Sequence, residues 1–313
     1  FPPSPPPRPP PPRIPAFYFP SFPTHPTRLT RSCSFPLSPP PSTHHASTAS
    51  PRIQASYNID DEGIKLLSAS TAREFQVTNE GLQTTTSRTG QTPPSELSYQ
   101  CSARDIHVFH TLGSGASGVV KKAVHVPSHR FIALKIMTVF EKEKRRQMIN
   151  EMRTLCDSPR QPGLVSFFGA FYSPETNQIS IALEYIEGGS LETIVKGAGR
   201  IPVPVLGKML GGVLEGLEYL HCQRKVVHRD IKPGNILMKL SGEPKITDFG
   251  ISAELGGTQG LLDSFKGTMC YMSPERIQNQ DYNFWADIWS LGLTMLECGL
   301  DKYPYEHLDG GPL

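Results

Sequence analysis

The sequence has 313 residues, of which 37% are hydrophobic and 19% charged, and its formal net charge is only +2. The charge is roughly balanced outside a basic start, and we expect no nucleic-acid partner. No apolar run approaches the roughly 18 residues that a bilayer requires, so we expect no membrane span. The six cysteines form no CxxC pair and have no metal-ligand spacing with histidine, which indicates reduced thiols in an intracellular protein.

The start of the chain, residues 1–56, is rich in Pro, Ser and Arg and poor in aliphatic residues. Such a segment buries too little apolar surface to offset the entropy of ordering, so we predict a disordered tail. No acidic residue precedes Asp60, and a basic, acid-poor start also fits a transit peptide, a docking segment or a gene-model artefact. A transit peptide begins at an initiator Met, whereas this chain begins at Phe1, which favours a solvated linker.

Regular structure is predicted mainly after residue 104. Residues 57–104 contain short apolar clusters without a sustained period, and we expect a weakly structured lead-in. β-Branched and aromatic residues then indicate an antiparallel meander at 106–115, 118–126 and 130–139, followed by further strands at 164–173 and 178–186. Between them, Met148, Met152 and Leu155 have the spacing of one helical face within 140–156. The pattern predicts a small sheet with one helix.

The second half of the chain is helical in character. Apolar residues recur at steps of four and three from Leu206 to Leu220, after the start signals Pro202 and Pro204, which predicts a long amphipathic helix. Residues 286–300 are apolar enough for a buried helix. The predicted fold class is therefore α+β, with a small β-rich lobe at 105–187 and a larger helical lobe at 188–313.

A glycine motif and a lysine open the part of the sequence that indicates chemistry. Gly113, Gly115 and Gly118 form GxGxxG, which alone is a weak signal, but a strand follows it, and this disfavours the dinucleotide-binding form. A glycine loop between two strands can instead cover phosphates with its backbone amides. Lys135 lies on the predicted third strand, and Glu151 on the next helix is placed to pair with it. Either residue alone is usually a surface charge.

Three later motifs decide the interpretation: HRDIKPGN from His228, DFG from Asp248, and Ser273-Pro274-Glu275. Their occurrence in this order after the glycine loop and the strand lysine makes coincidence negligible. Asp248 and Asn235 offer the hard oxygen atoms that Mg²⁺ prefers. Asp230 is expected to orient a substrate hydroxyl and accept its proton, and Lys232 to steady the γ-phosphate of ATP.

From Asp105 onward the sequence resembles a eukaryotic protein kinase, and specifically a mitogen-activated protein kinase kinase. The segments that carry this resemblance are HRDIKPGN, GTMCYMSPERI and EYIEGGSL. The segments SGASGVVKKAVHVPSHR, LSYQCSARDIHVF and CDSPRQPGLVSFFGAFYSPETNQISIALEY resemble the plant group that carries a downstream NTF2-like domain.

The resemblance implies a two-lobed kinase with ATP in the cleft, which phosphorylates Thr and Tyr hydroxyls of a downstream mitogen-activated protein kinase. It implies that Leu112, Val120, Ala133 and Leu237 surround the adenine. It further implies that Leu183 is the gatekeeper and that Glu184 and Ile186 supply hinge backbone contacts. A cytoplasmic location, with the nucleus as a second compartment, is the expectation for such a protein.

Regulation is expected between the DFG and SPE motifs, where Thr258 and Ser264 have five residues between them, as in the plant pattern. The animal pattern has two sites four apart, and here Gly260 stands four before Ser264. We expect an upstream kinase to phosphorylate Thr258 and Ser264, and the phosphates to recruit Arg229.

Two alternatives to an active kinase stay open, a nucleotide-binding pseudokinase and a Pro-rich adaptor with a vestigial kinase. An active enzyme is favoured because the charged and metal-binding residues are all present. Kinase helical lobes normally continue well beyond the ADIWSLG helix, and Glu275 usually pairs with an arginine there. We therefore expect the sequence to be a fragment with an incomplete helical lobe.

Overall fold

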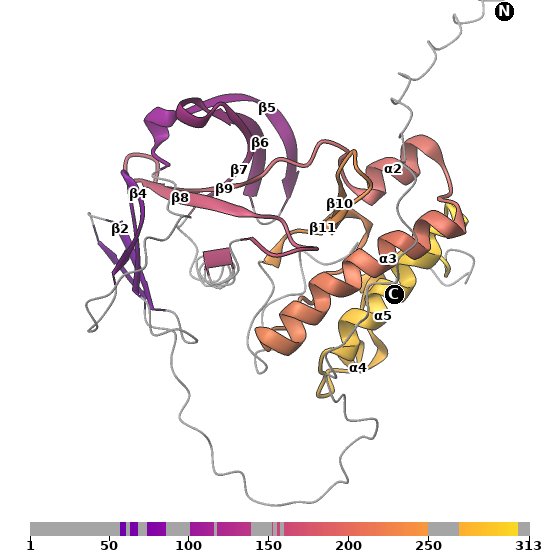
Figure 1. The fold of residues 1–313 in the computed structure, drawn as a ribbon. Coiled ribbons are helices and arrows are strands. Elements are labelled where there is room, and N and C mark those ends of the chain that lie inside the picture. The colour runs from indigo at the N-terminus through magenta and orange to yellow at the C-terminus, as the bar shows by residue number, and fades with distance from the viewer. Residues whose placement is uncertain are drawn as a thin grey trace, which may run out of the picture.

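The computed structural model describes residues 57–60, 63–67, 74–85, 101–115, 118–138, 152, 155–156, 160–249 and 269–305. Several sequence-based predictions lie outside these residues: the tail at 1–56, the side chain of Glu151, and the regulatory sites Thr258 and Ser264. Within the described residues the chain forms a β-rich lobe and a helical lobe, which confirms the α+β prediction (Figure 1).

The β-rich lobe is built on an antiparallel five-stranded sheet with the order β5-β6-β7-β9-β8. Its strands are β5 (Ile106–Gly115), β6 (Gly118–His125), β7 (Arg130–Thr138), β8 (Phe167–Ser173) and β9 (Gln178–Glu184). His129 adopts a left-handed backbone in the short turn between β6 and β7. Both β8 and β9 are buried along almost their whole length, so elements on both faces of the sheet cover them.

A second antiparallel sheet occupies residues 57–85, where the sequence pattern predicted only a weakly structured lead-in. Its strands are β1 (Tyr57–Asp60), β2 (Gly63–Leu67), β3 (Glu74–Thr78) and β4 (Gly81–Thr85), in the order β1-β2-β3-β4. Strands of four or five residues are too short for a period of two to stand out. Their stability comes from packing against β8, a contact between distant parts of the chain (Figure 1).

The helical lobe contains α2 (Leu191–Ala198), α3 (Val203–Glu218), α4 (Pro274–Ile277) and α5 (Trp285–Leu300). Ser190 begins α2 as its N-cap, because its hydroxyl accepts a hydrogen bond from the Thr193 amide. The predicted amphipathic helix is α3, which packs beside α5 (Figure 1). A short hairpin of β10 (Ile236–Met238) and β11 (Pro244–Ile246) lies between α3 and the β-rich lobe.

The glycines inside α3 allow a close approach between that helix and its neighbours. A Cβ atom at Gly216 would lie 2.9 Å from the Gly163 carbonyl oxygen, and one at Gly212 would lie 2.6 Å from the Pro244 ring. Each glycine costs a helix about 1 kcal/mol relative to alanine. Close packing on β11 and on residue 163 compensates for that cost. No helix in the described ranges is both long and apolar enough to cross a membrane.

Candidate active site

The loop that contains the HRD motif is held by a buried carboxylate on α5. Asp287 is fully buried, and its two oxygens accept hydrogen bonds of 2.7 Å from the backbone amides of His228 and Arg229. The ring of His221 lies 2.8 Å from the same carboxylate. Burial alone would raise the pKa of Asp287, but these hydrogen bonds outweigh burial and lower it. The ionised carboxylate therefore offsets the cost of the left-handed backbone at Arg229, whose φ is 73°.

Three predicted active-site residues meet directly after this anchor. The Lys232 ammonium donates to both carboxylate oxygens of Asp230, at 3.1 and 3.0 Å. The Asn235 amide nitrogen lies 2.7 Å from both the carbonyl oxygen and one carboxylate oxygen of Asp230. Because both of these partners are acceptors, the amide must donate to them, and its carbonyl oxygen is left to face other ligands. Asp230 is thus held in one orientation from two sides.

Lys135 and Asp248 bring the two lobes together. The Lys135 ammonium lies 2.8 Å from an Asp248 carboxylate oxygen, although the residues are 113 positions apart in the chain. Burial opposes ionisation of Asp248, but the charge of Lys135 outweighs burial and holds the pKa of Asp248 below its ordinary value. The Lys135 side chain is 2% exposed and the Asp248 side chain 37%. The carboxylate therefore remains accessible to a further cation.

Phe249 links the DFG motif to the catalytic loop. Its side chain is buried, and its ring meets the His228 ring edge-on at a centroid distance of 5.5 Å. His228 also lies 3.0 Å from the Thr247 carbonyl oxygen. The Thr247 backbone amide in turn donates to the backbone carbonyl oxygen of Asn235 at 3.0 Å. These contacts place Asn235 and Asp248 at the same end of the β10–β11 hairpin.

The donor atoms gathered at this end fit a magnesium ion. Asp248 supplies a carboxylate that stays ionised, and Asn235 supplies an amide oxygen whose nitrogen is already engaged by Asp230. Hard oxygen ligands of this kind suit Mg²⁺, which usually keeps water and phosphate oxygens as its other ligands. The resemblance to protein kinases implies ATP and a divalent metal, and the residues present are compatible with both.

The glycine-rich segment connects β5 and β6, and Lys135 lies on β7, the next strand of the same sheet. Gly113 pairs with Val120, and Val120 pairs with Lys135. Gly118 has a φ of 127°, and a Cβ atom there would lie 2.3 Å from the Ile136 carbonyl oxygen, so only glycine fits. A Cβ atom at Gly113 or Gly115 would meet no atom within 4 Å of it among the described residues. Leu112 directly precedes Gly113 on β5, and the other predicted nucleotide-binding residues of this lobe, Ala133 and Leu183, pair with each other on β7 and β9.

The segment between the lobes begins at Glu184, whose side chain makes contacts that the sequence did not suggest. Its carboxylate accepts hydrogen bonds from the Ser166 amide and hydroxyl, at 3.1 and 2.9 Å. It also forms a 2.9 Å ion pair with Lys239, just after β10. The predicted hinge residue Ile186 follows Glu184 by two positions and is buried, and the predicted adenine residue Leu237 precedes Lys239 by two positions. Glu184 therefore joins the lobes through its side chain while its backbone remains at the hinge.

Arg229 has a guanidinium group that is buried and not fully hydrogen-bonded within the described residues. Its side-chain atoms Nε and Nη2 are buried and have no hydrogen-bond partner among the described residues. The guanidinium lies 5.2 Å from the centre of the Tyr282 ring, and Arg276 lies 5.4 Å from the same ring. Burial lowers the pKa of Arg229, and the neighbouring Arg276 lowers it further. Such a group favours an approaching anion.

Of the residues that the sequence predicted for the chemistry, the structure brings Asp230, Lys232 and Asn235 together and pairs Lys135 with Asp248. The sequence did not predict the contacts of Asp287 or of the Glu184 side chain. The only available signal for Asp287 was an acid at the start of an otherwise apolar helix. Glu275 has no ion pair with any residue in the described ranges. The predicted residues Glu151, Thr258 and Ser264 lie outside those ranges.

The amino-acid sequence is similar to those of known protein kinases. The family model of the protein kinase domain matches residues 106–311. Mitogen-activated protein kinase kinase 3 of Arabidopsis thaliana is 51% identical over 251 residues, which cover 80% of this chain and 48% of that protein. Dual specificity mitogen-activated protein kinase kinase 1 of Dictyostelium discoideum is 48% identical over 212 residues, covering 67% and 31%.

Mitogen-activated protein kinase kinase 1 of Arabidopsis thaliana is 41% identical over 242 residues, which cover 76% of this chain and 68% of that protein. The chain spans about half the length of the first of these relatives. An ordered set of kinase motifs, a matching family model and an alignment over two thirds of a relative all agree. The chain belongs to the protein kinase family, in its mitogen-activated protein kinase kinase branch.

Proposed function

We propose that the protein is an ATP-dependent dual-specificity kinase that transfers the γ-phosphate of ATP to Thr and Tyr hydroxyls of a downstream mitogen-activated protein kinase. The observation that carries this proposal is the 2.8 Å ion pair between Lys135 and Asp248, which stands at one end of the hairpin that also holds Asn235. Relatives from Dictyostelium and Drosophila are named dual specificity kinases of this type.

Each charged residue has a distinct task in this reaction. Asp230, held by Asn235 and Lys232, orients the substrate hydroxyl and accepts its proton as the oxygen attacks the γ-phosphorus. Lys232 then faces the negative charge of the transferring group, and Lys135 positions the phosphates of ATP. Asp248 and Asn235 would hold Mg²⁺, which neutralises phosphate charge when bound. ADP leaves with the electron pair of the broken P–O bond.

The two alternatives have less support. A pseudokinase would normally lack one of the four residues Lys135, Asp230, Asn235 and Asp248, and here all four are present and in the arrangement described above. A Pro-rich adaptor with a vestigial kinase would not need Asp230 to be held on two sides. The geometry therefore favours an active enzyme.

We also propose that an upstream kinase switches the enzyme on by phosphorylating Thr258 and Ser264. Support comes from Arg229, a buried guanidinium whose Nε and Nη2 have no partner among the described residues. A phosphate carries close to two negative charges at neutral pH and would accept hydrogen bonds from such a group.

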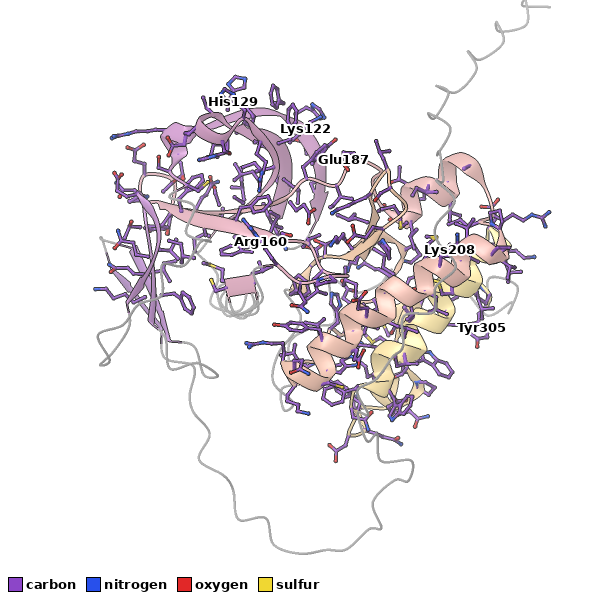
Figure 2. The ribbon with its side chains drawn as sticks, in the orientation of Figure 1. Lys122, His129, Arg160, Glu187, Lys208 and Tyr305 are labelled. Atoms are coloured by element: carbon purple, nitrogen blue, oxygen red, sulfur yellow. The ribbon has the colours of Figure 1, made fainter. Side chains whose placement is uncertain are left out.

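The catalytic proposal is tested with the chain, ATP, Mg²⁺ and a catalytically inactive mitogen-activated protein kinase as the substrate. Lys135→Met and Asp230→Asn should each abolish incorporation of phosphate on the Thr and Tyr residues of the substrate. One matched control is Lys208→Met, at an exposed lysine of α3 (Figure 2). The other is Asp281→Asn, at an exposed aspartate, and both variants should retain activity. Undiminished phosphorylation by the first two variants would refute the assignment.

Two finer proposals accompany this one. We infer from the plant-like segments quoted above that the chain belongs to the plant group whose members carry a downstream NTF2-like domain, which sequencing of the full transcript will test. We propose a cytoplasmic location, with the nucleus as a second compartment, because the proposed substrate class is a signalling kinase. Imaging of a fluorescent fusion in plant cells distinguishes this from an organellar location.

A further inference from the structure

The sheet β1–β4 lies before the region that matches the kinase family model, yet it shares the main hydrophobic core of the protein. The family match begins at residue 106, whereas this sheet occupies residues 57–85. Ile64 and Val77 are fully buried, and Phe75 is 3% exposed. All three belong to the same buried cluster as Tyr172 of β8 and Ile179 of β9.

The sheet has one apolar face and one polar face. On β3, Phe75 and Val77 are buried, while Gln76 between them is partly exposed. On β2, Ile64 is buried and Lys65 is partly exposed. A Cβ atom at Gly63 would lie only 2.1 Å from the Val77 carbonyl oxygen, so β2 begins in tight contact with β3. β2 and β3 are therefore closely packed together, and their apolar face is turned toward the hydrophobic core of the kinase domain.

The surface that receives this face is the edge of the five-stranded sheet. β3 and β4 pack against β8, which is the last strand in the order β5-β6-β7-β9-β8 (Figure 1). An edge strand normally keeps one side accessible to solvent. Here every residue from Phe167 to Tyr172 is buried, which requires a cover on the side away from β9. The sheet β1–β4 contributes that cover.

The same cluster extends to the residues that position Lys135. It contains Met152 and Leu155, both helical and both buried, and Met137, which is two residues after Lys135 on β7. Ile181 pairs directly with Lys135, and Ile179 pairs with Met137. The sheet β1–β4 packs on β8, β8 pairs with β9, and β9 pairs with β7, the strand that carries Lys135. Lys135 is almost fully buried, so its position depends on the packing around it.

We propose that the sheet β1–β4 is a positioning element of the catalytic lobe, and that Phe75 and Val77 hold β8, β9 and the helix at Met152 and Leu155 in the arrangement that places Lys135. Loosening this sheet weakens ATP binding and turnover without touching any residue that contacts substrate. The proposal rests on the proposed kinase function for its activity measurements alone.

The test uses the full chain with Val77→Asp, which places a charge in the buried interface. The matched control is Gln76→Asp, the neighbouring residue on the opposite face of β3. Val77→Asp should lower kcat/KM for ATP by roughly tenfold, as expected when a catalytic group is displaced by a fraction of an ångström, while Gln76→Asp stays within about twofold. The conservative variant Val77→Ile preserves the apolar contact and should keep wild-type kinetics.

Hydrogen exchange of the same variants separates positioning from general destabilisation. In Val77→Asp, amide exchange should rise in β1–β4, β8, β9 and residues 152–156, and remain at the wild-type level in α3 and α5. If Val77→Asp does not fold, Phe75→Leu is the milder variant, with the same expected pattern and a smaller kinetic effect. Faster exchange confined to β1–β4, together with unchanged kcat/KM, would overturn the proposal. A wild-type chain without kinase activity would contradict the proposed function instead. The exchange pattern would still show whether the sheet β1–β4 is coupled to β8, β9 and residues 152–156.

Discussion

The backbone amide of Arg229 donates a 2.7 Å hydrogen bond to Asp287, a fully buried residue 58 positions later in the chain. The neighbouring amide of His228 donates to the other oxygen of the same carboxylate at 2.7 Å. The catalytic loop is therefore fastened to α5 by main-chain groups. Its hold does not depend on the side chains that perform the chemistry.

Replacing this carboxylate should damage both stability and catalysis. Asp287→Ala leaves two buried amides without an acceptor, and we expect a loss of about 3 kcal/mol in the free energy of unfolding, together with a large fall in kcat. Urea denaturation and steady-state kinetics measure the two effects. Asp281→Ala, at an exposed aspartate, is the control and should change neither. A stable and fully active Asp287→Ala variant would show that the loop is held by other contacts.

The link between Glu184 and Lys239 should make stability depend on pH in the acid range. Burial raises the pKa of Glu184, but hydrogen bonds from Lys239 and Ser166 outweigh burial and lower it overall. The stabilisation is therefore fully present above the unfolded-state pKa of about 4.3 and is lost as the pH falls through the lower folded-state value.

Glu184→Gln is expected to be less stable than the wild type at pH 6, and the difference should shrink as the pH falls below 4. Denaturant titrations at a series of pH values measure this. Glu187→Gln, at an exposed residue of the same segment between the lobes, is the control (Figure 2). A difference that stays constant from pH 6 to pH 3 would contradict the assigned role of the Glu184 carboxylate.

Two glycines of α3 should respond to alanine in opposite directions. At Gly216 the new Cβ atom would lie 2.9 Å from the backbone oxygen of Gly163, so Gly216→Ala should destabilise the fold by about 2 kcal/mol through overpacking. At Gly211 no atom from another element of the described residues lies within 4 Å of that position, and Gly211→Ala should stabilise the helix by about 1 kcal/mol. Thermal and urea unfolding compare the pair. Equal effects would mean that helix propensity alone governs both sites.

Activation should require the two predicted phosphorylation sites and the buried arginine together. Thr258→Ala combined with Ser264→Ala should abolish activation by an upstream kinase, and Arg229→Ala should leave the phosphorylated enzyme near its basal rate, because the phosphate loses its buried partner. Ser252→Ala, in the same segment, serves as the control and should be activated normally. Rates before and after treatment with the upstream kinase provide the measurement. Normal activation of the double variant would remove these residues from the switch.

Much of the catalytic site was predictable because its chemistry is encoded locally. The HRDIKPGN and DFG motifs predict Asp230, Asn235 and Asp248 as site residues, because phosphoryl transfer permits few other residue types at such positions. The meander of β5, β6 and β7 was likewise visible, because its strands are long enough for β-branched and aromatic residues to form a pattern. The long period of apolar residues also indicated α3 correctly.

Other features depended on contacts that no local pattern contains. The strands of β1–β4 are too short to be recognised, and only packing on β8 buries Phe75 and Val77. Asp287 meets the catalytic loop across a separation of 58 residues, and Lys135 meets Asp248 across 113. The sequence by itself predicted which side chains would take part in the transfer of a phosphate. The tertiary structure decided how those atoms are held, because burial and long-range hydrogen bonds exist only after the chain has folded.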